Sequence, residues 1–461
     1  MPLPQAFRPI TPTAPAPRDV LETLFREGLE TVDGARLLRT HSRFDGERWH
    51  YDAGAAGRSI TFDIPREGRL IVVGAGKAAA ALARGLEDVF GDRIDDGCIV
   101  VKYGHTEKLA HIRQYEASHP VPDANGVEAT GHILATLREL TPDDRVIVLL
   151  TGGASALLVD PIEGISLEDK AATTRLLLHS SASIDEINAV RKSLSSVKGG
   201  GLLRHLAPAS SLTLLVSDVP NGDFGTIGSG PSIPEAGNGP DPIDIFRRHD
   251  LTDRLRPAVI NALERSADKR RVRGPDKGYH EVLLLAESAD LVRNVSALAR
   301  KQGLHTQIVE SCMNGNTHEQ AHRFVEAARR AVNEGEHDLL LIAAGETTLE
   351  VSGQGTGGRN QEFALYAARL LDGLPGVTLL AAGTDGTDGP TEAAGGFADG
   401  ASWSRARALG LDPAKALEDN DSHPLLAALG DLLVTGPSGT NLMDLVLALV
   451  GPDGSGRTTA P

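Results

Sequence analysis

The chain has 461 residues, of which 41% are hydrophobic, and its 46 basic and 62 acidic side chains give a formal net charge of −16. This length predicts two or three domains, and the apolar content excludes disorder as the main state. The acidic excess argues against a nucleic acid or an anionic membrane surface as the chief partner, because both need a basic surface. Small anionic substrates remain compatible with it where Lys and Arg gather locally.

The first 17 residues contain six prolines and predict a flexible or extended lead-in. This segment lacks the basic and apolar regions of a signal peptide, and no apolar run approaches the roughly 20 residues that a membrane span needs. Cys98 and Cys312 stand far apart, so we expect neither a disulfide framework nor a cysteine zinc site. These features predict a cytoplasmic protein, with a homo-oligomer left open.

Apolar strands alternate with helical segments through most of the chain. A helical pattern begins near Arg18, and residues 44–63 are rich in turns. From residue 69 the alternation is typical of parallel β-α-β units with helices on both faces of the sheet. We expect strands at RLIVV, CIVVKYG, RVIVLL and SLTLLVSDV, and helices after GAGK and over residues 126–140, 167–180 and 184–206.

A shift to Pro, Gly, Asp and Arg between residues 231 and 278 marks a domain boundary near 270–278. A second alternating series follows, with EVLLLAES, DLLLIAAGE, VTLLAAG and DLVLALV as strands and residues 317–333 and 360–371 as helices. The sequence therefore predicts a two-domain α/β protein. A larger, Rossmann-like domain with a mostly parallel sheet would span residues 18–272, and a smaller α/β domain residues 279–455.

Six short loops follow directly after apolar strands and combine glycine with charged or hydroxyl side chains. In open α/β sheets the ligand lies beyond the carboxyl ends of the strands, where glycine permits close approach and helix N-termini bind anions. One such loop is usually an ordinary turn, but six together favour a divided anion site. They span residues 74–77, 151–155, 217–231, 353–359, 383–389 and 435–441, with Gly74, Gly76, Gly152, Gly153, Ser155, Gly357, Gly358 and Asn441 as candidate ligand-binding residues.

The first loop, in VVGAGKAAA, matches the weak G-x-G-x-x-A form of the dinucleotide fingerprint. A dinucleotide site also needs an acidic residue at the end of the second strand, but Asp95 and Asp96 precede that strand and Lys102 ends it. The Walker pattern fails at two positions. What remains is Lys77 in the first turn of a helix, where it suits a phosphate or a carboxylate; a solvated lysine is the alternative.

INAVRKSLSSVKGGG holds two further candidate anion ligands, Arg191 and Lys198. Their spacing of seven residues would place both on one face of a helix. Glycines 199–201 inside a helix would cost about 1 kcal/mol each relative to Ala. This cost indicates close packing or a ligand against the backbone, with ordinary surface charge as the alternative.

Four aspartates stand in two of the loops: Asp218 and Asp223 in SDVPNGDFGTIGSGPS, and Asp385 and Asp388 in AAGTDGTDGP. Short carboxylates suit Mg²⁺, so all four are candidate metal ligands, although Asp is also a common turn residue. Arg359, in GQGTGGRNQE, supplies a planar cation that can stabilise a transferring phosphoryl group.

Residues 318–322 spell H-E-x-x-H, a pattern of zinc proteases. The third ligand of such a site is missing, since the positions about 20 residues further on are apolar. We therefore predict the polar face of an ordinary helix there.

Together the motifs resemble a known family. GAGKA, SHPVPD (118–123), GGASALL, RKSLSSVKGGGL, SDV…GD…IGSGP, GGRNQE, GTDGTDGP and TGPSGTN occur in the order found in the class II glycerate 2-kinases, the group with a C-terminal MOFRL domain that is often labelled hydroxypyruvate reductase. The resemblance covers residues 18–450. It implies an active site between two α/β domains, phosphorylation of the 2-hydroxyl of D-glycerate by ATP with Mg²⁺ or another divalent cation, and four essential residues: Lys77, Asp218, Arg359 and Asp385.

On this interpretation the two basic residues would hold the γ-phosphoryl group or the glycerate carboxylate, and the aspartates would bind the metal or accept the hydroxyl proton. The residues alone do not divide those roles. One alternative is an NAD(P)H-dependent hydroxypyruvate reductase, which the misplaced acid disfavours. Another is a sensor of nucleotides or sugar phosphates without catalysis, which the four aspartates disfavour. The kinase interpretation requires that the fold bring Lys77 and Arg359 into one site.

Overall fold

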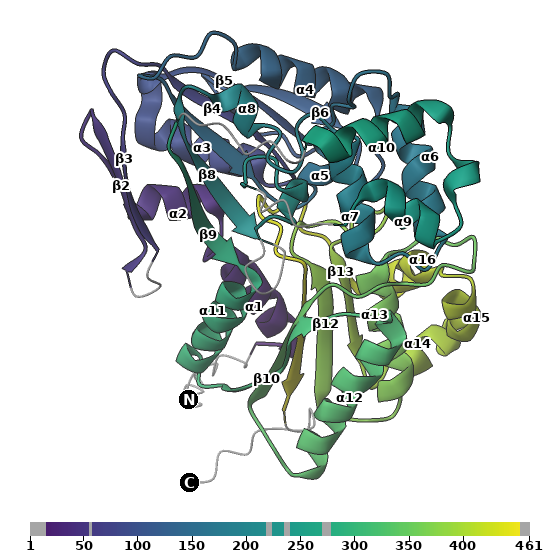
Figure 1. Ribbon diagram of the computed structural model, residues 1–461. Helices are drawn as coiled ribbons and strands as arrows, with labels where there is room; N and C mark the ends of the chain where they lie inside the picture. The colour runs from purple at the N-terminus through teal and green to yellow at the C-terminus, as the bar shows by residue number, and fades with distance from the viewer. Residues whose placement is uncertain (1–14, 55–57, 218–223, 235–239, 270–277, 452–461) are drawn as a thin grey trace, which may run out of the picture.

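The computed structural model describes residues 15–54, 58–217, 224–234, 240–269 and 278–451. In these residues the chain forms two six-stranded sheets, each packed against helices, and one small three-stranded sheet (Figure 1). The predicted fold class, a parallel helix-covered sheet followed by a second α/β unit, is confirmed. No helix among the described residues is long and apolar enough to cross a membrane.

The N-terminal sheet is parallel throughout, as the alternation of strands and helices predicted. Adjacent residues of its central strand face opposite ways, so Val72 joins one core cluster and Val73 another. Helix α3 (Ala79–Phe90) packs into the first cluster and α4 (Ala124–Thr136) into the second, which leaves the strands buried on both faces. The strand order is β6 (Arg113–Ala117), β5 (Ile94–Lys102), β4 (Leu70–Ala75), β7 (Arg145–Leu150), β8 (Ser210–Ser217) and β9 (His280–Glu287).

A separate group of helices follows the short helix α5 (Ala154–Leu157) and has a core of its own. The single helix predicted over residues 184–206 is wrong. In its place α7 ends at Ser193, and Gly199 and Gly200 turn with φ angles of +57° and +74°, a conformation that favours glycine and that a helix does not contain. The elements of this group are α6 (Leu167–Leu178), α7 (Ile184–Ser193), α9 (Pro242–Arg248) and α10 (Pro257–Lys269), whereas α8 (Leu203–Leu206) packs into the core of the first sheet.

The C-terminal sheet is mixed. Only its first two strands are parallel neighbours, and β15, the last strand of the chain, lies antiparallel between β11 and β12. The start of β15 therefore lies beside the carboxyl ends of both neighbours, which the alternating sequence pattern did not predict. The order is β10 (His305–Met313), β11 (Leu339–Gly345), β15 (Asp444–Val450), β12 (Val377–Gly383), β13 (Gly395–Asp399) and β14 (Leu432–Leu433).

Helices cover both faces of this second sheet. Helices α12 (Thr317–Asn333) and α13 (Arg359–Leu371) share one core cluster with the sheet, and α11 (Ser288–Lys301) packs into the cluster on the other face. Three short helices lie beside α13: α14 (Ser402–Ala408), α15 (Pro413–Glu418) and α16 (Ser422–Leu429).

The region expected to be rich in turns, residues 44–63, contains most of an antiparallel three-stranded sheet. Trp49 in its middle strand is fully buried, with its ring centroid 5.6 Å from that of Phe90 in α3. This contact attaches the small sheet to the N-terminal domain. Its strands are β1 (Ser42–Phe44), β2 (Arg48–Asp52) and β3 (Ser59–Asp63), which follow helix α2 (Gly34–His41).

Two elements belong to a different sheet from the one that the predicted boundaries imply. Helix α1 (Pro17–Glu30) packs against α11 and the second sheet (Figure 1), and Arg18 forms ion pairs of 2.9 Å with Asp399 and 2.6 Å with Asp431. Strand β9, the expected start of the C-terminal domain, pairs with β8 and completes the first sheet. An apolar pattern shows that an element has a face to bury but does not say against which sheet.

The boundaries 18–272 and 279–455 therefore do not separate two independently packed units. One core cluster runs from Val72 in β4 through Val295 in α11 to Leu380 in β12. The lead-in predicted for residues 1–17 falls mostly outside the described residues, and Pro17 already begins α1.

We expect the packing of α1 to contribute strongly to stability. Phe25 of α1 is fully buried in the shared cluster, so Phe25→Ala should lower the free energy of unfolding in urea by about 3–5 kcal/mol. The control Glu27→Ala changes an exposed residue of the same helix and should stay within about 0.5 kcal/mol of the unmodified protein. Equal stabilities of the two variants would contradict this placement of α1.

Candidate active site between the two sheets

An ion pair joins the two domains at the carboxyl ends of their sheets. Lys77 follows β4 and Asp385 follows β12, and the lysine Nζ lies 2.6 Å from the aspartate Oδ2. Asp385 also accepts hydrogen bonds from the backbone N–H of Thr387 (3.0 Å) and from its hydroxyl (3.2 Å). Burial acts to raise the pKa of Asp385, but Lys77 and these donors outweigh it and lower that pKa. The carboxylate is therefore ionised at neutral pH.

Close backbone packing holds Lys77 in place. Gly76 has a φ of +137°, and a Cβ there would lie 2.1 Å from the hydroxyl oxygen of Thr151, so only glycine fits. The N–H of Lys77 donates to the carbonyl of Gly152 at 3.0 Å, which ties the first two predicted loops together. Gly74 lies within β4 itself, where a Cβ would come 2.5 Å from the backbone of β7. These glycines serve contacts between loops and strands.

Lys102 makes a second link between the domains. It is the last residue of β5, and its Nζ lies 3.2 Å from Oγ1 of Thr387, the residue that also donates to Asp385. Burial is the largest effect on Lys102 and lowers its pKa. The sequence placed this lysine at the end of a strand, where it counted only as evidence against NAD. Its position at a carboxyl strand end was the signal for a role in the site.

Two histidines accompany these lysines, and sequence reasoning did not select them. A Cβ on Gly153 would lie 3.1 Å from Cγ of Lys77 and 3.2 Å from Cδ2 of His119, so the lysine and the imidazole share one small space. Burial, followed by the charges of Lys77 and Lys102, lowers the pKa of His119 to about 4. Burial also lowers the pKa of His105. Neutral imidazoles therefore line a site that already contains two ammonium groups.

Arg359 begins α13 and is held by two carboxylates. Its Nε and Nη2 lie 2.6 and 2.9 Å from the two oxygens of Asp444, the first residue of β15, and Nη1 lies 2.8 Å from Glu346. Burial opposes the charge of Arg359, but both acids outweigh it and raise the pKa of the guanidinium. All three guanidinium nitrogens are thus engaged. These contacts use three of the five N–H groups, and departure of Glu346, whose side chain is 53% exposed, frees a further one for a phosphoryl group.

Asp388 is a buried anchor for the start of α13. Its oxygens accept hydrogen bonds from the backbone N–H of Asn360 (3.1 Å), the backbone N–H of Gln361 (2.9 Å) and the side-chain amide of Gln361 (3.1 Å). Burial raises its pKa to about 6 despite these donors. A Cβ on Gly358 would lie 2.3 Å from Cγ of Asp388, so this glycine makes room for the anchor. These contacts argue for positioning Arg359 and against the metal-binding role expected of Asp388.

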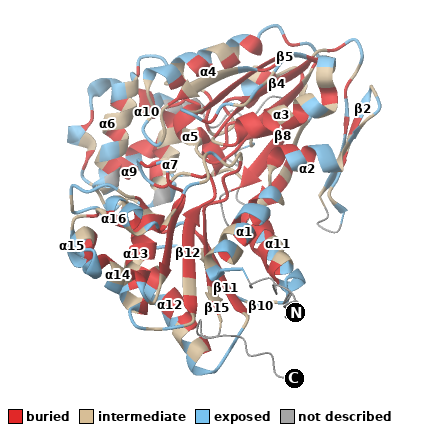
Figure 2. Ribbon diagram, turned by 180° about the vertical axis from the view of Figure 1, so that it is seen from behind, coloured by how far each residue is buried: buried red, intermediate tan, exposed pale blue. Residues whose placement is uncertain are grey.

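The lysine–aspartate pair and the arginine cluster are neighbours. A Cβ on Gly383, the last residue of β12, would lie 3.5 Å from Oδ1 of Asp385 and 3.6 Å from Nδ2 of Asn360. Asn360 in turn donates to Asp444 at 2.9 Å, the same carboxylate that holds the arginine. A chain of short contacts therefore joins Lys77 to Arg359, as the kinase interpretation requires. Figures 1 and 2 show the two sheets one above the other, with buried strands of both running toward the region between them.

The remaining loops close around this centre. In the loop at 435–441, Ser438 donates its backbone N–H to the carbonyl of Asp385 at 3.3 Å, and Asn441 of the same loop is buried. A Cβ on Gly357 would lie 2.2 Å from the hydroxyl of Ser422, which shows how tightly the GGR loop is packed. The Nζ of Lys198 lies 2.9 Å from Oγ of Ser155, and that Oγ lies 3.0 Å from Oγ of Ser229. The described parts of all six loops thus contact another loop or an element of the site.

The predicted metal ligands remain incomplete. Asp218 and Asp223 lie outside the described residues, and their roles stay predictions. Asp385 is engaged by a lysine and Asp388 by N–H donors. In the part of the chain that the structure describes, no three His, Cys, Asp or Glu side chains are grouped to hold a metal ion. These residues do not form a complete Mg²⁺ site, and we assign them no step that depends on a metal.

The remaining motifs have ordinary structural roles. Asp95 and Asp96 lie at the start of β5. The site loops follow the other ends of the strands, so these two acids are at the wrong end of the sheet for a dinucleotide ribose. His318 of the H-E-x-x-H segment pairs with Glu362 at 2.9 Å and stacks on Tyr366 with ring centroids 4.2 Å apart. This histidine is part of the contact between α12 and α13.

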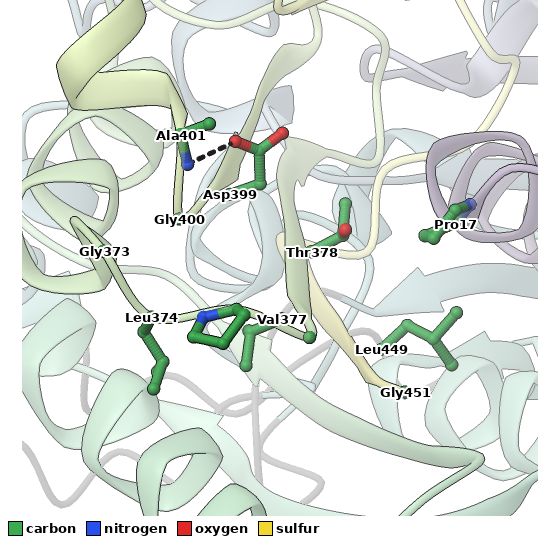
Figure 3. A pocket seen from close by; sticks show the side chains of 12 residues that line it. Pro17, Gly373, Leu374, Val377, Thr378, Asp399, Gly400, Ala401, Leu449 and Gly451 are labelled. Atoms are coloured by element: carbon green, nitrogen blue, oxygen red, sulfur yellow. Dashed lines mark hydrogen bonds between the residues drawn. The ribbon is translucent and has the colours of Figure 1, made fainter. Parts of the chain in front are cut away.

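A hollow of about 440 Å³ lies at the far end of the second sheet (Figure 3). Its walls include Val377 at the start of β12, Leu449 near the end of β15 and Pro17 of α1. Asp399 is its acidic side chain and accepts a hydrogen bond from the backbone N–H of Ala401 at 2.9 Å. Because the lysine–aspartate pair lies at the opposite end of β12, this hollow is not part of the candidate active site.

Comparison with known proteins identifies relatives along almost the whole chain. Residues 20–264 match a family described as a domain of unknown function, DUF4147, and residues 339–444 match the MOFRL family. A D-glycerate 2-kinase of Thermotoga maritima is 38% identical over 389 residues, which cover 83% of this chain and 91% of that protein. A putative hydroxypyruvate reductase of Agrobacterium vitis is 39% identical over 389 residues, covering 83% of this chain and 100% of the relative. The crystal structure of a glycerate kinase from Thermotoga maritima superposes with a TM-score of 0.78 at 34% identity, covering 94% of this chain and 99% of that one.

The neutral state of His119 predicts a pH dependence of stability. Between pH 4 and 6.5 the unfolded chain binds a proton at this residue and the folded protein does not, so stability should rise with pH across that window. His119→Gln cannot titrate, and its unfolding free energy should rise less steeply by up to about 1.4 kcal/mol per pH unit. The exposed residue His337 provides the control, since His337→Gln should keep the slope of the unmodified protein. Urea titrations at several pH values measure all three slopes, and a slope unchanged in His119→Gln would contradict the assignment.

Proposed function

Because the chain belongs to the glycerate kinase family that combines a DUF4147 domain with a MOFRL domain, we propose that it transfers the γ-phosphoryl group of ATP to the 2-hydroxyl of D-glycerate, giving 2-phospho-D-glycerate and ADP. The observation that carries this proposal is the ion pair of Lys77 and Asp385, which unites opposite charges from two sheets where their loops converge. Phosphoryl transfer depends mainly on positioning and on charge neutralisation, and this arrangement supplies both.

The two ammonium groups are suited to the phosphoryl oxygens. Lys77 and Lys102 end adjacent parallel strands or follow them directly, so both project from one edge of the first sheet toward the second domain. In that place they neutralise the charge of a transferring phosphoryl group. The uncharged imidazoles of His105 and His119 give this space hydrogen-bonding atoms without further positive charge.

The acceptor hydroxyl belongs beside Asp385. Its carboxylate is ionised and faces Lys77, so a hydroxyl that donates to it lies next to the cation that binds the phosphoryl group. We assign Asp385 to orient the 2-hydroxyl and to accept its proton as the phosphoryl group arrives. Substrate binding then replaces a direct ion pair with contacts to the reactants, and the two domains exclude water from them.

Arg359 is assigned to the rim of the same site. Asp444 fixes its guanidinium from the inner side, while Glu346 on the outer side is exposed and free to move into solvent. Displacement of Glu346 by a phosphate or carboxylate leaves one edge of the fork for the reactant. ATP as donor and Mg²⁺ or another divalent cation as its companion remain part of the proposal, together with the roles predicted for Asp218 and Asp223.

The reductase alternative has less support. A dinucleotide ribose needs an acid at the end of the second strand, where this chain has Lys102 bonded to the other domain. A relative named putative hydroxypyruvate reductase and one named D-glycerate 2-kinase are about equally similar to this chain, at 39% and 38% identity. We also propose that the enzyme is cytoplasmic and that its partners are the small molecules D-glycerate and ATP, with no nucleic acid and no membrane. A homo-oligomer is compatible with this proposal.

Phosphorus NMR of the reaction product tests the reaction directly. Purified protein with D-glycerate, ATP and Mg²⁺ should yield a phosphate ester whose signal is split by the single proton on carbon 2. Splitting by the two protons of carbon 3 would overturn the position, and no ester at all would overturn the kinase. A parallel sample with hydroxypyruvate and NADH, followed at the nicotinamide absorbance, should show no turnover, whereas steady oxidation of NADH would favour the reductase.

Variants of the two predicted cations test the site. Lys77→Ala and Arg359→Ala should each lower kcat by about 100-fold or more, because each removes a charge that stabilises the transferring group. Arg359→Lys keeps the charge but loses the fork, so we expect an intermediate activity. Lys108→Ala, at an exposed position, is the control and should keep full activity. With circular dichroism unchanged in every variant, near-normal turnover of both alanine variants would reject the assignment.

A further inference from the structure

A second group of basic side chains lies behind the loop that follows β7. We call it the cation cluster and define it as Lys170 of α6, Arg191 of α7, and Lys198 of the turn before α8. The three charges are close enough to repel one another. The charge of Arg191 lowers the pKa of Lys170, and the charges of Lys170 and Arg191 both lower the pKa of Lys198. The spacing of Arg191 and Lys198 predicts one shared helix face, but α7 ends at Ser193 and Lys198 lies in the turn beyond it.

The cluster has fewer partners than its charge requires. Lys198 is buried and donates to the backbone carbonyl and hydroxyl of Ser155. The Nζ of Lys170 is shielded from solvent and has no hydrogen-bond partner in the described parts of the chain. Asp160 is the carboxylate that acts on Lys170, and it already accepts a hydrogen bond from the hydroxyl of Ser196.

Among the described residues Asp160 is the one acid that acts on these three cations, which leaves an excess of positive charge in a partly to fully buried place. Burial is the largest effect on each of the three and lowers their pKa values, that of Lys170 to about 8. Buried ammonium groups are normally paired, because an unpaired charge away from water is costly. Groups that lower the stability of the free protein are typical of binding sites, where a ligand supplies the missing partner.

The position of the cluster connects it to the candidate active site. Ser155, which accepts a hydrogen bond from Lys198, stands two residues after Gly153, where an added Cβ would lie 3.1 Å from Lys77 and 3.2 Å from His119. The hydroxyl of Ser155 also lies 3.0 Å from that of Ser229 in the loop after β8. An anion held by the cluster is thus attached to the same loop that lies against the reacting centre.

We propose that the cation cluster is a second oxyanion subsite, which binds a carboxylate or phosphate group of a reactant through Lys170, Arg191 and the hydroxyl of Ser155. The identity of the reactant rests on the proposed function, but the binding of an oxyanion does not. Glycerate offers a carboxylate one carbon from the reacting hydroxyl, and the donor offers its phosphates. Both present the same chemistry to the cluster, and the kinetic experiment below separates them.

Lys170→Met is the appropriate test variant, because methionine keeps the apolar stem and removes only the unpaired ammonium group. Its melting temperature without added anions should equal or exceed that of the unmodified protein, since the variant loses no hydrogen bond to the described residues and relieves the repulsion from Arg191 and Lys198. The matched control is Arg175→Gln, which removes an exposed positive charge from the same helix. A Lys77→Met protein completes the set, since it removes a cation of the candidate active site and retains the cluster.

The first experiment uses inorganic phosphate as the probe, with chloride at equal ionic strength as the reference, and follows thermal unfolding. Phosphate should raise the melting temperature of the unmodified protein, of Arg175→Gln and of Lys77→Met, and at least half of this rise should be lost in Lys170→Met. An undiminished rise in Lys170→Met overturns the subsite. This measurement does not depend on catalysis, so a protein without kinase activity can still show the subsite.

The second experiment is steady-state kinetics with D-glycerate and ATP. In Lys170→Met we expect the KM of one reactant to rise at least 10-fold with Arg175→Gln unchanged. A rise for D-glycerate assigns the cluster to the carboxylate, and a rise for ATP assigns it to a phosphate of the donor. If both KM values stay unchanged in a well-folded variant that turns over normally, the cluster is no reactant subsite and the proposal fails.

Discussion

The ion pair between Lys77 and Asp385 requires that the loops after β4 and β12 meet, and much of the structure holds them in that position. These residues come from different sheets, so their contact exists only if the carboxyl ends of β4 and β12 face each other. Taking both charges out of water is costly, and such a pair is maintained only when the backbone fixes both partners. Gly76 and Thr387 do this on the two sides, one by close packing and the other by hydrogen bonds.

The abundance of glycine in the site loops has a structural cause that differs from the one first expected. The sequence predicts glycines that permit close approach of a ligand, yet many of these positions permit close approach of another part of the protein. A Cβ on Gly386 would lie 2.0 Å from the carbonyl of Gly436, and one on Gly358 would meet Asp388. The loops are thus packed on one another, which gives the site the rigidity that positioning requires.

The basic residues of the site differ in how many partners already neutralise their charge, and this difference says more about ligand binding than their sequence motifs do. Arg359 stands in a distinctive motif, but two carboxylates already contact all three nitrogens of its guanidinium. Lys170 stands in no motif, and its ammonium group has no hydrogen-bond partner among the described residues. A motif reports which residue types occur together, whereas the balance of charge reports what a ligand still has to supply. That balance depends on contacts between residues far apart in the chain.

The sequence by itself determined the type of elements, the two α/β sheets and the loops that carry chemistry, because hydrophobic periodicity and strand-end glycines are local properties. Lys77 and Asp385 were recognisable in this way. Only the tertiary structure decided that β9 completes the first sheet, that α1 covers the second, and that β15 runs antiparallel with Asp444 beside Arg359. Local patterns say that a face must be buried or a charge paired, and the partner is chosen by the folding of the whole chain.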